Sequence, residues 1–499
     1  MDKRTKSAKN FFFLAVNEAI AIAFGLILPR MFIISYGSEV NGLLNSMSQF
    51  LVCLNLFEAG IGGVTLQALY KPVAEDDWDA ISGVMASSSR YYKRAGLFYL
   101  TGLLALTGIY PLVVDSSLPF GTVAGAVFFS GAGNVVLFYF QAKYQYLLQA
   151  DGKGYIFTNL TAISTVLTSL SKIVLIQRGA NIVLILAAAF VLQCLQIAYV
   201  LWYARSYDKL RPDAPPNNQA LAQKDSVLVH QISSLVFRNT DVMILTVFCG
   251  LQTVSVYTVY KMVSSHLESL LRIPVSSVNF VMGQTFQTDR ALYVRRSDLL
   301  ESYYSALLFS LFSVALFLYL PFVRVYTAGA DISYADPWLA VLFVLIALLN
   351  NSRGISDNTG SYAGHFRQTV PFTIIESAIN LTTSLIGVCF LGIYGVLLGT
   401  VAALAYRTNQ TILYANHKVL NRGAGRTYAI YGVNILLFFL VQFLFRRLLG
   451  GTALDSYPRL IAAGFASTLL ALAVFFGGQT LLFPHCRQMV RDVLRHRKA

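Results

Sequence analysis

Long apolar segments dominate this chain and decide what it can fold into. Each has about 20 residues or more, the length that an α-helix needs to cross a bilayer, and a helix satisfies its own backbone hydrogen bonds within lipid. The segments cover residues 11–36, 40–69, 95–114, 120–142, 155–177, 180–203, 226–249, 251–281, 302–327, 337–356, 370–391, 393–416, 427–448 and 458–483. Hydrophobic residues make up 56% of the sequence and charged residues 12%, which excludes an ordinary soluble domain. We therefore predict an all-α polytopic membrane protein with about fourteen transmembrane helices.

Basic residues predict the orientation of these helices. Short cytoplasmic loops collect Lys and Arg, and with an internal N-terminus most of the 38 Lys and Arg residues fall on the inner side. The outer loops then hold only Arg178, Arg324, Arg446, Arg447 and Arg459. Both termini are therefore predicted to be cytoplasmic. The formal charge of +14 is explained by this asymmetry and by attraction to anionic lipid, and not by nucleic-acid binding.

A polar break at residues 205–225 separates the first six apolar segments from the next six. It holds three of the thirteen prolines and is typical of a linker. Shifting the chain by 215 residues aligns FTNLTAISTVLTSL with FTIIESAINLTTSL, which favours two parallel repeats. We predict two six-helix lobes, 1–204 and 226–420, around a central cavity, followed by a C-terminal helix pair with a basic tail, 421–499. Residues 75–90 are expected to lie along the cytoplasmic surface as an amphipathic helix.

Charged residues interrupt one apolar segment in a regular pattern. In VYKMVSSHLESLLRIP, at 100° per residue, Glu268 and Arg272 fall within about 20° of Lys261. Each charge at the bilayer centre costs about 2.5 to 3.5 kcal/mol, so this face is not expected to meet lipid. For any single residue the alternative is a structural ion pair, such as Glu268–Arg272 or Arg238–Asp241. For the whole set, a hydrated cavity between the lobes is the better explanation.

Two groups of charged residues in the four most polar segments form the candidate site. Cations suit phosphate or pyrophosphate, and the candidate substrate-binding residues are Arg30, Arg238, Lys261 and Arg272. Buried acids can exchange protons during transport, and the candidate ion-coupling residues are Glu18, Glu58, Asp241 and Glu268. The acids nearly balance the cations, so they would either couple transport to protons or Na⁺ or merely neutralise the cations.

Motifs of enzymes and metal sites are absent from the sequence. It holds no GxxxxGK[ST] phosphate loop and no HExxH helix, and its five cysteines show no CxxC pair. The loops are too short to build an enzyme domain. We therefore predict a protein that is not an enzyme and that has no metal or cofactor.

Several quoted stretches together resemble a known family. The run YGSEVNGLLNSMSQFLVCLNLFEAGIGG, with LLQADGKGYI, HQISSLVFRNTDVMIL and ESAINLTTSLIGVCFLGIYGVLLGT, is similar to bacterial polysaccharide flippases of the multidrug/oligosaccharidyl-lipid/polysaccharide (MOP) exporter superfamily. The resemblance covers most of residues 8–416. FEAGIGG places Glu58 at the family's motif in the second span, and LPRMFIISYG places Arg30 at the basic position that ends the first.

The resemblance implies a function. Such a flippase would move an undecaprenyl-pyrophosphate-linked oligosaccharide from the inner to the outer leaflet of the bacterial cytoplasmic membrane by alternating access. Its product would serve the synthesis of O-antigen, lipopolysaccharide, capsule or another surface polysaccharide, with a polymerase and assembly proteins as partners. Fourteen spans depart from the twelve usual in the O-antigen type, which leaves the glycan open.

Two other functions stay open. An exporter of small amphipathic drugs, as in another branch of the superfamily, would need a cavity dominated by acids and aromatics, which the four candidate cations oppose. A non-transporting scaffold of a polysaccharide assembly complex would keep the cavity only as a relic.

Overall fold

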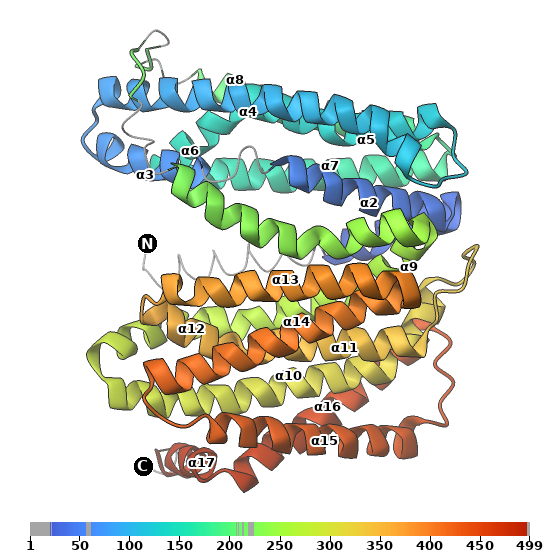
Figure 1. Ribbon diagram of the computed structural model, residues 1–499, viewed down its shortest axis with the longest axis vertical. Helices are drawn as coiled ribbons and strands as arrows, with labels where there is room; N and C mark the ends of the chain where they lie inside the picture. Colours follow the sequence, from blue (N-terminus) through green and yellow to red (C-terminus); the bar gives the residue numbers. More distant parts are fainter. Residues whose placement is uncertain are drawn as a thin grey trace. The chain divides into compact units, whose positions relative to one another are not determined.

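Helices are the only regular elements in the described part of the chain (Figure 1). The computed structural model describes residues 20, 22–55, 61–205, 207, 209–211, 214–217 and 224–496, without the side chains of 224–239, 490 and 492–496. Ten of the described helices are long and apolar enough to cross a membrane. The predicted all-α polytopic fold is confirmed.

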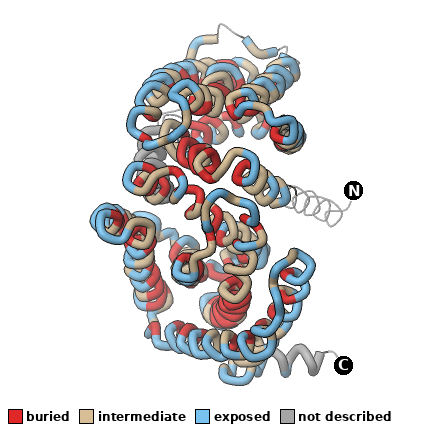
Figure 2. Tube along the Cα trace, turned by 90° about the vertical axis from the view of Figure 1, so that its right-hand side faces the viewer, coloured by how far each residue is buried: buried red, intermediate tan, exposed pale blue. Residues whose placement is uncertain are grey.

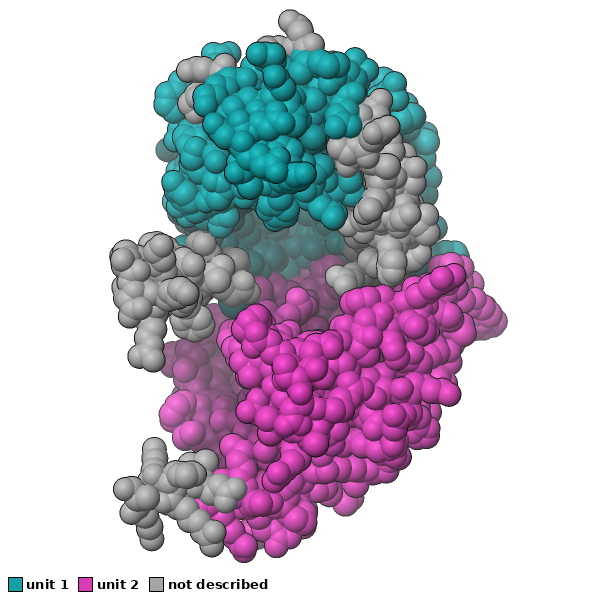
Figure 3. Space-filling view, turned by 90° about the vertical axis from the view of Figure 1, so that its left-hand side faces the viewer, with its two compact units in different colours: residues 1–255 teal, residues 256–499 magenta. Residues whose placement is uncertain are grey.

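Two compact units divide the chain, Met1–Ser255 and Val256–Ala499 (Figure 3). The first unit holds the helix Ile22–Tyr36, α2 (Ser38–Leu54), α3 (Ile61–Ala74), α4 (Trp78–Val113), α5 (Phe120–Val136), the π-helix η2 (Leu137–Gln141), α6 (Ala142–Ala150), α7 (Gly154–Gln177) and α8 (Ile182–Ala204). Helix α9 (Lys224–Thr288) begins in this unit and ends in the second, with a kink at Gly250, whose φ is 79°.

The second unit continues from the later turns of α9. It holds α10 (Arg290–Tyr326), α11 (Pro337–Ser352), α12 (Gly354–Tyr362), α13 (Phe366–Leu391), α14 (Ile393–Tyr414), the π-helix η4 (Ala415–Val419), α15 (Gly425–Leu449), α16 (Tyr457–Leu482) and α17 (Pro484–His496). The division between the units lies inside α9, C-terminal to the linker predicted at residues 205–225.

Aspartate caps fix where three long helices begin. Each carboxylate accepts a hydrogen bond from a backbone N–H of the first turn, which satisfies a donor that the helix itself leaves unpaired. The caps are Asp77 for α4, Asp289 for α10 and Asp336 for α11. Pro337 occupies the first turn of α11, where a missing N–H costs nothing.

The surface helix predicted at residues 75–90 is corrected by the structure. Helix α4 runs without a break from Trp78 to Val113, 36 residues or about 54 Å at 1.5 Å per residue. No proline interrupts it before Pro111, so residues 78–90 continue the axis of the following apolar segment. They form the first turns of a long helix that exceeds the roughly 30 Å of a hydrocarbon core.

One other predicted segment differs from the observed helices: residues 40–69 give two helices, α2 and α3, with 56–60 outside the described residues. The predicted division between 226–249 and 251–281 coincides with the kink of α9 at Gly250, whose backbone is not helical. The segment 11–36 is described only at residue 20 and from residue 22. The count of fourteen spans stays a prediction.

Large apolar side chains are exposed along many of the long helices, and exposed and buried stretches alternate along several of them (Figure 2). Phe390 at the end of α13 is 82% exposed and Leu112 in α4 is 76% exposed. Soluble monomers rarely expose large contiguous apolar patches, whereas lipid accommodates them without penalty. These outward faces fit helices that meet a bilayer.

Glycines let two helices of the second unit approach closely. A Cβ added to Gly395 in α14 would lie 2.1 Å from the backbone of Gly387 in α13, and real Cβ atoms do not come so near. Small residues at such crossings are a common way for membrane helices to pack, since dispersion contacts there take the place of the hydrophobic effect. The α13–α14 hairpin (Figure 1) frames the site described next.

Candidate functional site

The second part of α9 carries three of the predicted site residues on one face. The helix is continuous from Lys261 to Arg272, so the predicted spacing is kept. The carboxylate of Glu268 interacts electrostatically with both cations. Lys261 Nζ lies 5.5 Å from the ring centroid of Tyr257, a distance at which a cation is attracted to an aromatic face. Arg272 is exposed and Lys261 and Glu268 are partly buried.

Hydrogen bonds to α10 hold this part of α9 in place. Tyr319 donates its hydroxyl hydrogen to the Tyr260 carbonyl at 2.7 Å, so Ser264 is the donor in the 2.9 Å bond between Ser264 Oγ and Tyr319. Glu268 follows one turn later, within electrostatic range of Tyr304 of α10. The orientation of the Glu268 face is therefore set by the core of the second unit.

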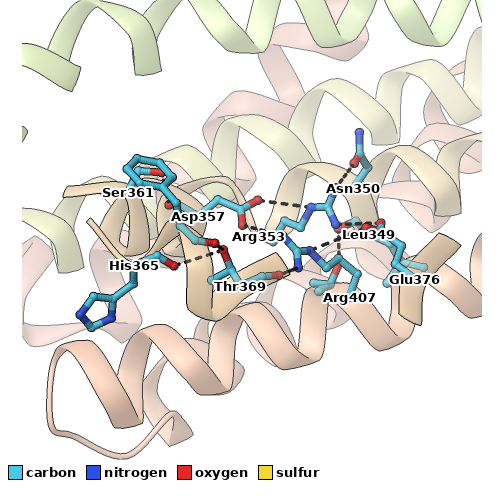
Figure 4. A network of polar contacts seen from close by, with 11 residues as sticks. Leu349, Asn350, Arg353, Asp357, Ser361, His365, Thr369, Glu376 and Arg407 are labelled. Carbon is cyan, nitrogen blue, oxygen red and sulfur yellow. Dashed lines mark hydrogen bonds and ion pairs between the residues drawn. The ribbon is translucent and has the colours of Figure 1, made fainter. Parts of the chain in front are cut away.

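A network of four charged residues lies next to this face, on α11 to α14 (Figure 4). Arg353 places Nη1 3.0 Å from Glu376 Oε1 and Nε 3.4 Å from Asp357 Oδ2. Arg407 lies 3.7 Å from the second oxygen of Glu376 and 3.9 Å from Asp357. The side chain of Glu376 is 4% exposed, against 40% for Asp357. Two cations thus share two acids, with Glu376 as the buried centre.

Asparagines join the network to the α9 face. Arg353 Nη2 donates to Asn350 Oδ1 at 3.1 Å, and the amides of Asn350 and Asn351 interact with Glu268. A row of polar groups therefore leads from Arg272 through Glu268 and the asparagines to Arg353 and its acids. Such a row within apolar helices can hold charge or relay a proton.

A cavity of about 190 Å³ adjoins the far end of this network. It is lined by Asp357 and Arg407, by the hydroxyl-bearing side chains of α12 and α14, and by His365. Nδ1 of His365 lies 2.9 Å from the Tyr414 hydroxyl. At one end the network therefore borders this cavity, which Asp357 and His365 line. At the other end it borders the charged face of α9.

Comparison with solved structures places this arrangement in a known fold. The structure of the lipid II flippase MurJ in an inward closed conformation matches with a TM-score of 0.67 at 13% identity, covering 93% of this chain and 99% of that one. An inward-facing multidrug resistance MATE family transporter of the MOP superfamily matches with a TM-score of 0.59 at 15% identity, over 82% and 96% of the two chains. The chain therefore shares its overall fold with these two proteins.

The similarity to these proteins lies in the structure, since the sequence identities are low. The MATE multidrug transporter DinF-BH also matches, with a TM-score of 0.58 at 15% identity over 81% and 95% of the chains. No protein-family profile and no curated protein sequence matches this chain. The ten long apolar helices and this shared fold identify a multi-pass membrane protein.

The structure describes only two of the other five predicted site residues with their side chains. Arg30 is partly buried near the end of the helix Ile22–Tyr36, and Asp241 is partly buried in the first part of α9. Glu18, Glu58 and the side chain of Arg238 lie outside the described residues. The structure therefore brings together Lys261, Glu268 and Arg272, and the roles of all eight candidates stay predictions.

Several polar residues of α2 have a structural role in the first unit. Asn41 Nδ2 donates to Ser255 Oγ at 2.7 Å, and Ser46 Oγ lies 2.6 Å from Thr246 Oγ1. A Cβ on Gly42 would lie 1.8 Å from the Leu251 carbonyl oxygen, so α2 and α9 meet backbone to backbone. These contacts bind α9 as far as Ser255 to the first unit, and they explain why the boundary falls inside α9.

The charged network was not predicted, although the sequence holds a signal for it. Arg353 is one of the basic residues on the predicted inner side, and Asp357 lies just beyond the apolar segment 337–356. Glu376 and Arg407 interrupt the apolar segments 370–391 and 393–416 in the same way as Lys261 interrupts its own. Charges inside apolar segments therefore pointed to these two residues as well. Among the described residues, no group of three or more His, Cys, Asp or Glu could hold a metal ion.

Proposed function

We propose that the chain is a flippase that moves an undecaprenyl-pyrophosphate-linked oligosaccharide from the inner to the outer leaflet of the bacterial cytoplasmic membrane, for cell-surface polysaccharide synthesis. The observation that carries the proposal is the face of α9, with Lys261 and Arg272 beside Glu268, in a chain that shares its fold with a lipid II flippase over nearly its whole length. Both termini would be cytoplasmic, and a polymerase and assembly proteins would take over the cargo.

The spacing of the two cations suggests how they would act. Eleven residues separate Lys261 from Arg272, about 16 Å along the helix axis, so one phosphate cannot touch both at once. They would bind the pyrophosphate in succession, and Glu268 between them would limit how tightly either cation holds it. Arg30 and Arg238 would complete the substrate-binding set, while the lipid tail stays in the bilayer.

Export of amphipathic drugs is the second candidate function. The likeness to MATE multidrug transporters, which covers more than four fifths of this chain, favours it. Positive charge on the α9 face opposes it, since a cationic drug would be repelled by Lys261 and Arg272. A non-transporting scaffold is the third candidate, and it predicts that neither activity depends on this face.

Alanine at both cations separates these functions. Lys261→Ala with Arg272→Ala should abolish surface glycan in a producing strain while protein levels stay normal, and Lys261→Arg should retain part of the activity. Arg295→Ala with Arg367→Ala, which removes two exposed cations of the same unit, is the matched control. Glycan and efflux of a cationic dye would be measured on the same cells. Normal glycan in the Lys261/Arg272 variant would contradict the proposal, and lost efflux with normal glycan would favour the drug exporter.

A further inference from the structure

A cationic cavity lies in the first unit, whereas Lys261, Glu268 and Arg272 belong to the second. Its volume is about 570 Å³, within the range of about 300 to 1,000 Å³ that is usual for ligand pockets. Its walls come from the first turns of α4, from α6 and from the segment after α8. The lining includes Ser82, Ser89, Arg90, Lys93, Lys143, Tyr144 and Arg211.

Four cations line this cavity, and three of them have no described acid beside them. Arg211 pairs with Asp79 at 2.8 Å, and both side chains are exposed. Among the described residues, no carboxylate forms an ion pair with Arg90, Lys93 or Lys143; the linker acids Asp208 and Asp213 lie outside them. A concave surface with one sign of charge concentrates counter-ions. The cavity therefore favours an anion.

Lys143 is the innermost of these cations. Its Nζ donates to Ser89 Oγ at 3.1 Å and lies 4.9 Å from the ring centroid of Tyr144. An ammonium group has three hydrogens, so Lys143 keeps donors for a ligand after bonding to Ser89. Lys93 and Arg90 line the same cavity and are exposed, and Lys93 Nζ lies 5.7 Å from the ring centroid of Tyr139. A bound anion would therefore meet one partly buried lysine and two exposed cations.

Leu210, Arg211 and Ala214, which follow α8, line one side of the cavity, and described residues of this segment are anchored to α4. The backbone N–H of Arg211 donates to Ser82 Oγ at 3.0 Å, and that of Asn217 donates to the Gly83 carbonyl at 3.1 Å. Leu210 packs against the buried cluster that includes Met85. The side of the cavity formed by this segment is thus held by backbone contacts and by apolar packing.

Contacts of Tyr207 with Asp151 hold the N-terminal part of the same segment. Tyr207 donates to Asp151 Oδ2 at 2.6 Å, and Lys153 Nζ lies 2.7 Å from the same oxygen. The Tyr207 ring also packs against Trp78, with ring centroids 6.0 Å apart. The cavity is therefore lined by α4, α6 and described residues after α8, and its four cations come from these three parts of the chain.

We propose that this cavity binds the phosphate group of an anionic ligand through Lys143, Lys93 and Arg90. Phosphate oxygens accept several charge-assisted hydrogen bonds, which Lys and Arg supply, and the Ser89 hydroxyl adds a neutral partner. The phosphate belongs either to a free phosphorylated compound or to the headgroup of an anionic lipid. The proposal concerns the first unit alone and holds whatever cargo the α9 face carries.

Two probes separate the sources of the phosphate. Titration of the purified full chain in neutral detergent with sodium pyrophosphate, followed by calorimetry, measures the free anion. Native mass spectrometry after mixing with phosphatidylglycerol or phosphatidylcholine measures the lipid headgroup. Lys93→Gln with Lys143→Gln should weaken whichever ligand binds by at least about tenfold, since each lysine would supply a charge-assisted hydrogen bond to the phosphate. Lys143→Arg should retain binding.

The matched control removes two cations elsewhere. Arg295→Gln with Arg367→Gln changes the net charge equally and should leave binding unchanged, which excludes a general charge effect. The unfolding temperature of each variant without ligand shows that it is folded. Saturable pyrophosphate binding that is lost in the lysine variant identifies a free phosphate ligand, and selective loss of phosphatidylglycerol identifies a lipid. The proposal is overturned if the native chain binds neither probe, or if the lysine variant binds as well as the control.

Discussion

Glu376 shows how a single buried acid can organise several helices. Its two carboxylate oxygens face Arg353 of the α11–α12 junction and Arg407 of α14, at 3.0 and 3.7 Å. Removing one partner of a buried pair leaves an uncompensated charge, which costs more than the pair itself contributes. Glu268 is different, because it is partly exposed and lies beside two cations on the face proposed to meet the cargo.

The same substitution at these two acids should therefore have different results. Glu376→Gln should lower the free energy of unfolding by about 3 kcal/mol, since it leaves Arg353 and Arg407 with only Asp357. Glu268→Gln should leave stability nearly unchanged and should remove the response of export to collapse of the proton gradient. Thermal unfolding of the purified variants and glycan export with and without a protonophore measure the two effects.

The other acids of the charged network and of the ion-coupling set serve as controls for this prediction. Asp357→Asn removes the more exposed acid of the network and should cost less stability than Glu376→Gln. Glu18, Glu58 and Asp241, the other coupling candidates, are tested in the same export assay. An unaltered response to the proton gradient in Glu268→Gln would remove Glu268 from the coupling set.

Helix α15 is attached to α10 by a row of polar contacts. Asp298, 3% exposed, binds Arg426 and lies 2.6 Å from Arg422 Nη1. Further along the two helices, three hydrogen bonds repeat the pattern: Thr427 to Glu301, Asn434 to Ser305, and Gln442 to the Ser313 carbonyl. The penultimate transmembrane helix is therefore bound to the second unit through polar groups that lipid cannot replace.

Neutralising Asp298 should loosen this attachment. Asp298→Asn leaves two arginines without their acid, so the free energy of unfolding should fall by about 3 to 5 kcal/mol. Asp455→Asn is the matched control, because Asp455 and Arg459 form an exposed pair at 2.7 Å, for which about 0 to 1 kcal/mol is expected. Thermal unfolding of both variants measures the difference. Equal unfolding temperatures would show that the Asp298 cluster does not hold α15.

At the scale of the whole molecule, the predicted topology places the segment after α8 and the turn between α15 and α16 on opposite sides of the membrane. The segment after α8 is anchored to the first turns of α4 by its backbone, on the side that the basic residues predict to be cytoplasmic. The turn between α15 and α16 is predicted to be external. Both places offer exposed positions, Pro215 and Thr452.

Cysteine labelling of intact cells tests this orientation. In a background without the exposed Cys389, Thr452→Cys should react with a membrane-impermeant maleimide. Pro215→Cys should react only after the membrane is permeabilised. Strong labelling of Pro215→Cys in intact cells would overturn the predicted topology.

Part of the candidate site could be predicted from the sequence. The 100° step of a helix was enough to place Lys261, Glu268 and Arg272 on one face, because α9 is regular between them. The pairing of Arg353 with Glu376 was not predictable, since the two residues lie on different helices. Arg422 is one of the basic residues on the predicted inner side, and it binds Asp298, 124 residues away. No local sequence pattern indicates a partner at such a separation.

The sequence by itself determined that the chain is helical and membrane-embedded, because apolar length and internal backbone hydrogen bonding are local properties. It also determined several helix starts, through caps such as Asp77 and Asp336. Only the tertiary structure decided which charges neutralise one another, where α9 passes from one unit to the other, and that Arg90, Lys93 and Lys143 line one cavity. These features depend on which helices become neighbours, and that is settled by packing across the whole chain.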